Sequence, residues 1–180
     1  MNFIIYDLEA TCWDGRPPGM IQEVIEIGAY KIDEYGQAVD KFSRFIKPQA
    51  HPVLSLFCRQ LTGISQVDIN RASDYQRVIE DFLDWIDIDE DYLLCSWGDF
   101  DRKIFIKNCN QHRMDFEWAD DYHLNLKAQY YRIRNFSKPV GLQKALRVEG
   151  FEFDGDPHRG IDDAYNTCKI FMHLMDHWSY

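Results

Sequence analysis

The first strand-length segment of the chain is apolar and stops at two acids. Residues 3–6 read Phe-Ile-Ile-Tyr, and Asp7 and Glu9 follow with one residue between them. A continuous apolar run is typical of a strand buried on both faces, such as the central strand of a mixed or parallel sheet. Because side chains alternate along a strand, Asp7 and Glu9 should point the same way, with Cβ atoms roughly 6–7 Å apart.

Beyond this strand, the apolar spacing predicts a hairpin and then helices that alternate with further strands. Strands are predicted at 23–32 and 37–46, joined by a turn at 34–36, and again at 92–97 and 118–124. Helices are predicted at 53–61, 75–88, 99–109, 126–132, 142–148 and 160–178. Together these elements indicate one α/β domain over residues 1–180, with a mixed five-stranded sheet flanked by helices.

The composition excludes several classes of protein. Hydrophobic residues make up 46% of the 180 positions and aromatic residues 15%, which is typical of a chain with a packed core rather than of a disordered one. No apolar run approaches the roughly 20 residues of a membrane span, and no secretory leader pattern is present. The five cysteines are scattered without a C-x-x-C pair, which disfavours disulfides and zinc. We therefore expect a cytoplasmic protein without membrane association.

The charge is acidic overall but unevenly distributed. The net charge of −10 disfavours strong nonspecific binding to long nucleic acids, which depends on neutralising phosphates. Residues 68–101 hold eleven acids against two arginines, a pattern we interpret as solvated helix faces. Residues 125–150 hold six basic residues against one acid. This basic stretch fits either another solvated face or a patch that follows phosphates.

A second apolar strand also ends in acids. The strand predicted at 92–97 is followed by Asp99 and Asp101. Asp99 occupies the position where aspartate ordinarily caps a helix N-terminus. Asp101 would then lie in the first helical turn and look back toward the sheet.

A histidine and two adjacent acids surround the start of the last predicted helix. His158 lies between Pro157 and Gly160, and Asp162 and Asp163 follow. Residues five apart on a continuous helix point about 140° away from each other. His158 and Asp163 can therefore meet in one site only if the histidine precedes the helix. The acids alone would also fit a helix cap or a favourable interaction with the helix dipole.

As a set, these residues suit phosphoryl transfer assisted by two divalent metal ions. Mg²⁺ and Mn²⁺ favour oxygen ligands, and a pair of such ions stabilises the attacking and the leaving oxygen. Imidazole titrates near neutral pH, so a histidine beside the acids can take a proton from the attacking water.

The motifs that carry these residues resemble those of the DEDDh superfamily of 3′-5′ exonucleases. They are D-x-E-A-T at 7–11, G-x-F-D at 98–101 and H-x-G-x-D-D-A at 158–164. Within the superfamily the chain is most similar to the ERI-type exoribonucleases, including KapD-like bacterial proteins. The segments that indicate this branch are EATCW at 9–13, EVIEIGA at 23–29, LFC at 56–58, LTGI at 61–64 and FDG at 153–155.

The resemblance implies a ribonuclease H-like fold and an enzyme that releases nucleoside monophosphates from single-stranded RNA or DNA 3′ ends. It makes Asp7, Glu9, Asp101 and Asp163 the ligands of two Mg²⁺ or Mn²⁺ ions. It makes His158, which would also contact the substrate, the general base. Two alternatives stay open at this point: a DNA-directed exonuclease of the same superfamily and a catalytically inactive binding module.

The resemblance also suggests where the substrate binds. The residues after the second acid, Ala10, Thr11 and Cys12, would contact the terminal nucleotide, with Thr11 hydrogen-bonding to its 3′ end. Aromatic side chains stack on any base, and the chain's candidates for this role are Trp13, Phe57, Trp97 and Phe100. A core role is an equal alternative for each of them. Further along the strand, we expect phosphate contacts from some of Lys127, Arg132, Arg134 and Lys138.

Overall fold

A mixed five-stranded sheet forms the centre of the computed structural model, which describes residues 1–15 and 17–180. The order of the strands across the sheet is β3-β2-β1-β4-β5, so the first strand is central, as its apolar run predicts. β1 is antiparallel to β2 and parallel to β4, and the hairpin of β2 and β3 is present as predicted. The strands are β1 Asn2–Ala10, β2 Val24–Ile32, β3 Ala38–Phe45, β4 Tyr92–Ser96 and β5 His123–Asn125.

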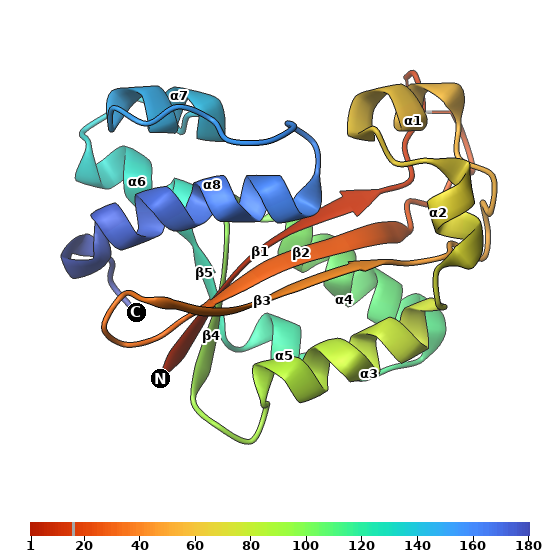
Figure 1. The fold of residues 1–180 in the computed structure, drawn as a ribbon, viewed down its shortest axis with the longest axis horizontal. Coiled ribbons are helices and arrows are strands. Elements are labelled where there is room, and N and C mark those ends of the chain that lie inside the picture. Colours follow the sequence, from red (N-terminus) through yellow and green to blue (C-terminus); the bar gives the residue numbers. More distant parts are fainter. Residues whose placement is uncertain (16) are drawn as a thin grey trace.

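Helices cover both faces of this sheet (Figure 1). Three of them, α3, α4 and α5, pack on one face, and α6, α7 and α8 pack on the other. The two short helices α1 and α2 pack near the start of β2 with a smaller apolar cluster. The helices are α1 Leu56–Thr62, α2 Gln66–Arg71, α3 Tyr75–Ile86, α4 Phe100–His112, α5 Glu117–Asp120, α6 Leu126–Ile133, α7 Leu142–Val148 and α8 Gly160–His173.

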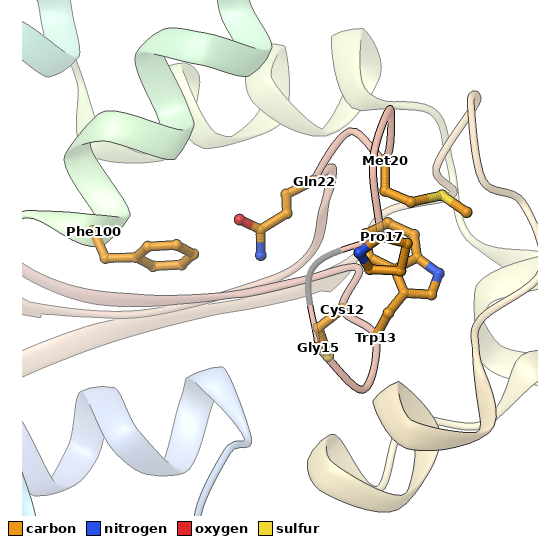
Figure 2. Close-up of a pocket in the computed structure, with 7 residues that line it drawn as sticks. All are labelled: Cys12, Trp13, Gly15, Pro17, Met20, Gln22 and Phe100. Carbon is orange, nitrogen blue, oxygen red and sulfur yellow. The ribbon is translucent and has the colours of Figure 1, made fainter.

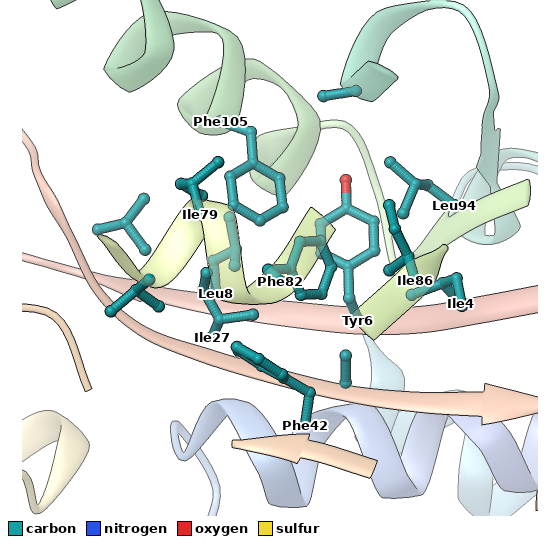
Figure 3. Packing of buried hydrophobic residues seen from close by; sticks show 14 of the residues in the cluster. Ile4, Tyr6, Leu8, Ile27, Phe42, Ile79, Phe82, Ile86, Leu94 and Phe105 are labelled. Carbon is teal, nitrogen blue, oxygen red and sulfur yellow. The ribbon is translucent and has the colours of Figure 1, made fainter. Parts of the chain in front are cut away.

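The alternation of side chains along β1 decides which face receives the two acids. Ile4, Tyr6 and Leu8 point into the core beneath α3 and α4, where Tyr6 stacks against a phenylalanine of α4 (Figure 3). Phe3 and Ile5 point into the opposite core with α8. Odd-numbered positions of the strand therefore face α8, and Asp7 and Glu9 continue that series.

The prediction of a strand over 118–124 is wrong for its first half. Residues 117–120 form the short helix α5, and the strand β5 begins only at His123. Trp118 and Ala119 are buried against α3 and α4, and the Trp118 indole N–H donates to the Asp115 carbonyl at 3.0 Å. A helical turn buries these two adjacent residues on one face, whereas a strand would turn them to opposite faces.

One further helix and one helix end differ from the sequence-based prediction. Helix α2 was not predicted, because its short segment is polar apart from a few apolar positions; Ser65 caps it by accepting a hydrogen bond from the Asp68 N–H at 3.1 Å. Helix α8 ends at His173 instead of 178, and a 3₁₀ turn follows at Met175–His177. Across the described residues, every helix is too short or too polar to span a bilayer.

Candidate active site

Three carboxylates meet where β1 ends and α8 begins. Asp7 and Glu9 come from β1, and Asp163 comes from the first turn of α8. Each offers an oxygen atom, and the three atoms lie within 4.8 Å of one another. The helix approaches the sheet this closely because Gly28 of β2 packs against Gly160, where an added Cβ would overlap the helix backbone. The sequence thus brings the acids together through strand alternation and a glycine contact.

Asp101 reaches the same strand from helix α4, on the other face of the sheet. Its side chain is 6% exposed, and its Oδ1 accepts a hydrogen bond from the Leu8 N–H at 3.0 Å. The pairing between β1 and β4 ends at Ile5 and Cys95, which leaves this edge of β1 open to the start of α4. Asp101 is therefore bound to the residue between the two β1 acids, although it is not part of the group of three.

Asp99 occupies the N-cap position of α4 but does not cap the helix with its side chain. Its Oδ1 accepts a hydrogen bond from the Asn125 amide at 3.0 Å, and its Oδ2 pairs with the Lys103 ammonium at 3.6 Å. The predicted N-cap position of Asp99 is confirmed, and its side chain binds Asn125 of β5 instead of a backbone N–H of the helix. Asp99 is engaged away from the other acids.

Burial raises the pKa values of the four acids, and their repulsion of one another adds to the effect. Burial raises the pKa of Glu9 to about 9, with the charges of Asp163 and other nearby acids adding to the effect. Burial also raises the pKa of Asp101 to about 7, against the opposing hydrogen bond from Leu8. It raises the pKa of Asp163 to about 6. The pKa of Asp7 lies well above its usual range, because the group is buried beside these acids.

This donor set fits a hard divalent cation. Within residues 1–15 and 17–180, neither the Asp7 nor the Glu9 carboxylate takes part in a hydrogen bond or an ion pair. Buried carboxylates without partners destabilise a fold unless positive charge compensates them. Carboxylate oxygens are the ligands that Mg²⁺ and Mn²⁺ favour, so a cation between these side chains would supply the missing charge.

His158 lies on an exposed turn just before α8, which confirms that it is off the helix. Its backbone is left-handed, with φ of 66°, and its N–H donates to Asp163 Oδ2 at 2.7 Å. The neighbouring acid Asp162 instead accepts a hydrogen bond from the Asp156 N–H at 2.9 Å. The two adjacent acids are thus divided: Asp163 joins the carboxylate group and Asp162 stabilises the turn.

A cavity of about 460 Å³ lies next to the end of β1 (Figure 2). Three of the residues predicted to bind substrate, Cys12, Trp13 and Phe100, contribute to its wall. Phe100 is 52% exposed and projects from the start of α4 toward the loop that carries the other two. The complete lining is Cys12, Trp13, Gly15, Pro17, Met20, Gln22 and Phe100. Met20 and Gln22 were not identified as lining residues from the sequence. The one indication in the sequence is that they lie between this loop and β2.

Two other residues predicted to bind substrate, Ala10 and Thr11, are buried within the fold. Ala10 is buried in the core, and Thr11 is 2% exposed. The Thr11 hydroxyl accepts a hydrogen bond from the Glu23 N–H at 2.9 Å and donates to the Ile21 carbonyl at 3.4 Å. The single Thr11 O–H is thus engaged within the fold. The predicted hydrogen bond from Thr11 to the 3′ end stays a prediction.

The two remaining aromatic candidates differ from each other. Phe57, in the first turn of α1, is 38% exposed and thus accessible. Trp97 packs against Tyr130 in the core beneath α6, and its indole N–H donates to the Val140 carbonyl at 3.2 Å. For Trp97 the structure supports the core alternative.

The basic stretch is partly neutralised within the fold. Arg134 forms two hydrogen bonds with the Glu149 carboxylate, at 2.8 and 2.6 Å. Lys127, in contrast, extends beside Gly98, close to the carboxyl end of β4. A phosphate contact from this stretch stays a prediction, and Arg134 is the member least free to provide one.

Sequence reasoning missed a fifth acid at the site. Glu26 lies directly opposite Glu9 in the pairing of β1 and β2 and is fully buried. Its carboxylate forms an ion pair with Arg159, the residue after His158. The available signal was an acid within the apolar first part of the strand Val24–Ile32.

Comparison with known proteins places this geometry among nucleases. The sequence profile of the RNase T family, described as exonuclease, matches residues 4–171. Human 3′-5′ exoribonuclease 1 is 30% identical over 182 residues, which cover 95% of this chain and 51% of that protein. The probable 3′-5′ exonuclease KapD of Bacillus subtilis is 27% identical, with coverage of 94% and 82%. The chain thus spans about half of the human relative.

The solved structures agree with the sequence comparisons. The nuclease domain of 3′hExo, a DEDDh family member bound to rAMP, superposes with a TM-score of 0.89 at 28% identity. The aligned region covers 97% of this chain and 92% of that domain. The resemblance to ERI-type exoribonucleases and KapD, and the ribonuclease H-like fold expected from it, are confirmed.

Proposed function

We propose that this chain, which belongs to the RNase T family of exonucleases, removes nucleotides from the 3′ end of single-stranded RNA or short oligonucleotides. The observation that carries the proposal is the approach of Asp7, Glu9 and Asp163 to within 4.8 Å, with Asp101 bound to the same strand. Hydrolysis at the last phosphodiester bond would release a nucleoside monophosphate and leave a new 3′ end in place.

The four carboxylates would hold two divalent metal ions, Mg²⁺ or Mn²⁺. Ions at this position supply stabilisation for the attacking and the leaving oxygen of the phosphodiester. The protein contributes a buried set of oxygen donors whose mutual repulsion a divalent charge relieves. Asp99 and Asp162 are not part of the proposed set: Asp99 binds the Asn125 amide and Asp162 accepts from the Asp156 N–H, whereas Asp101 accepts from Leu8, between the two acids of β1.

His158 would act as general base toward the attacking water. It is exposed on its turn, and its backbone N–H donates to Asp163, so the His158 backbone adjoins the carboxylate group. Its side chain is not a member of that group. A base must reach its proton through one hydrogen bond or one intervening water. The turn before α8 gives the side chain the freedom to do so from the solvent side.

The 3′-terminal nucleotide would occupy the cavity beside the end of β1. Trp13 and Phe100 offer aromatic faces on two sides of it, and Phe57 is accessible on α1. Stacking tolerates any base, which suits an exonuclease that proceeds along a strand. The net charge of −10 favours local contacts near the 3′ end over a long phosphate track.

The substrate class is tested by incubating the pure protein with 5′-labelled oligomers of matched sequence in Mg²⁺ or Mn²⁺. The oligomers are single-stranded RNA, single-stranded DNA and a blunt DNA duplex. We expect single strands to shorten faster than the duplex, and RNA at least as fast as DNA. Faster removal of paired DNA ends would favour the DNA-directed alternative. Tight binding of the oligomers without any shortening in either metal would favour an inactive binding module.

A further inference from the structure

Among residues 1–15 and 17–180, the hydrogen-bond donors to the buried Glu26 carboxylate come from the segment that carries His158. Arg159 Nε and Nη2 each lie 3.2 Å from one of its oxygens, and the Gly160 N–H donates to it at 3.1 Å. Glu26 is fully buried, so the ion pair is shielded from solvent on the carboxylate side. Three donors on one carboxylate, two of them from a guanidinium fork, give a well-defined geometry.

Arg159 is held at both its side chain and its backbone. The guanidinium lies over the ring of Phe45 at 5.3 Å and binds Glu26, so two strands of the sheet contact it. The Arg159 carbonyl accepts hydrogen bonds from the Asp162 and Asp163 N–H groups, both at 2.9 Å, which begin the helix. The residue next to His158 is therefore fixed to the sheet at one end and to α8 at the other.

His158 itself has little else to position it. The side chain is exposed, its backbone adopts the left-handed region that non-glycine residues rarely occupy, and its N–H is bonded to Asp163. Such a backbone conformation persists only where the surroundings enforce it. Arg159 follows directly in the chain and attaches the turn to the sheet through Glu26.

We propose that the Glu26–Arg159 ion pair is a positioning device that holds the turn of His158 in register with Asp163. This inference rests on the proposed function, since it concerns the general base of that reaction. Glu26 acts as the anchor on the sheet and Arg159 as the arm that reaches it. Neither residue belongs to the group of three acids, and the guanidinium acts through the turn rather than on the substrate.

The first test compares Arg159→Met, Arg159→Lys and Glu26→Gln with the wild type on a single-stranded RNA oligomer. Arg159→Met should lower kcat by about 10- to 100-fold, part of the roughly 10²–10⁴ that loss of a general base costs. KM should change by less than about twofold, because the substrate contacts remain. Arg159→Lys keeps the positive charge but lacks the guanidinium fork, so its kcat should lie between those of the wild type and Arg159→Met. Arg77→Met, which removes an exposed ion pair on α3, is the matched control.

The second test asks whether the effect passes through His158. In a His158→Ala background, Arg159→Met should lower kcat by less than about threefold, because residues that act as one unit are not additive. Amide hydrogen exchange gives a readout without activity: the His158 N–H, bonded to Asp163, should lose protection in Arg159→Met and keep it in Arg77→Met. This readout decides the inference even if the wild type hydrolyses none of the oligomers, a result that would count against the proposed function alone.

Three results would overturn the positioning role. The first is a folded Arg159→Met variant with wild-type kcat and unchanged exchange at His158. The second is a rise in KM at constant kcat, which would assign the guanidinium to the substrate. The third is full additivity with His158→Ala. If Arg159→Met does not fold, Arg159→Lys and Glu26→Gln carry the same comparisons, since both retain the volume of the buried pair.

Discussion

The Asp101 carboxylate accepts a hydrogen bond from the Leu8 backbone N–H at 3.0 Å, across the sheet edge that β4 leaves open. Helix α4 and strand β1 are joined at the point where β1 presents its two acids. Through this bond the fourth carboxylate reaches the end of β1 from α4, which packs on the face of the sheet opposite to α8. It also distinguishes Asp101 from Asp99, which is bonded to β5.

The first prediction separates these two acids. Asp101→Asn keeps an oxygen that can accept the Leu8 N–H, so the fold should persist while hydrolysis falls by at least about 10²-fold, as for loss of a group that stabilises the transition state. Asp99→Asn should retain activity within a few-fold. Steady-state rates on one RNA oligomer, with melting curves as the folding control, measure both. A larger loss in Asp99→Asn would show that the register at α4 is wrong.

The second prediction concerns the pair at the start of α8. Asp163 shares the group of three acids and Asp162 accepts from the Asp156 N–H, so Asp163→Asn should abolish turnover and Asp162→Asn should not. The Asp162→Asn side chain keeps one oxygen that can accept the Asp156 N–H, so the turn should persist. Rates on the same oligomer decide the ranking, and the reverse order would exclude Asp163 from the site.

The third prediction tests the base. His158→Ala should lower kcat by about 10²–10⁴, the usual cost of removing a general base. Metal affinity, measured by calorimetry, should stay close to that of the wild type, because His158 is not among the proposed ligands. Wild-type turnover in His158→Ala would mean that another group activates the water.

The fourth prediction concerns stability in the absence of metal. The raised pKa values of Asp101, about 7, and Asp163, about 6, mean that the folded state binds protons more tightly than the unfolded chain does. Metal-free protein should therefore lose stability as the pH rises from about 4, an ordinary carboxyl pKa, through about 6–7, and further toward about 9 as Glu9 ionises. Divalent cation should restore more stability at alkaline pH than at mildly acidic pH, because the acids are then charged.

Asp7→Asn sharpens the stability test, because it removes one of the repelling charges. At alkaline pH without metal its Tm should exceed that of the wild type, by about 2–4 °C for each kcal/mol of repulsion relieved in a protein of this size. Its Tm should also respond less to added Mn²⁺. Asp99→Asn serves as the control and should follow the wild type in both respects. Metal-free stability that increases with pH over this range would contradict the assignment of uncompensated buried acids.

Much of the fold follows from local pattern. The apolar run before Asp7 predicts a central strand, and alternation places Asp7 and Glu9 on one face, because both rules depend only on neighbouring residues. The segment 118–124 fails for the opposite reason: Trp118 and Ala119 form a helical turn only because α3 and α4 supply a core on one side. Tertiary packing overrides local preference there.

In the functional site, too, some features follow from local sequence and others depend on tertiary contacts. Strand ends and a helix start indicate candidate acids beside His158, and the resemblance to the DEDDh superfamily selects Asp101 and Asp163 among them. Glu26 was not found in this way, since its role depends on pairing with Glu9 across strands and on Arg159 in a distant part of the chain. The Thr11 hydroxyl is another example, because only the folded loop reveals that Glu23 and Ile21 engage it. Contacts between distant segments are not contained in local pattern.

The central claim is that Asp7, Glu9, Asp101 and Asp163 form a metal-dependent exonuclease site, and the dependence of hydrolysis on metal tests it most directly. A 5′-labelled single-stranded RNA should shorten stepwise from its 3′ end in Mg²⁺ or Mn²⁺, with release of nucleoside monophosphate. The reaction should stop in EDTA, resume when excess Mg²⁺ is restored, and be absent in Asp7→Asn. Undiminished hydrolysis in excess EDTA would contradict the account.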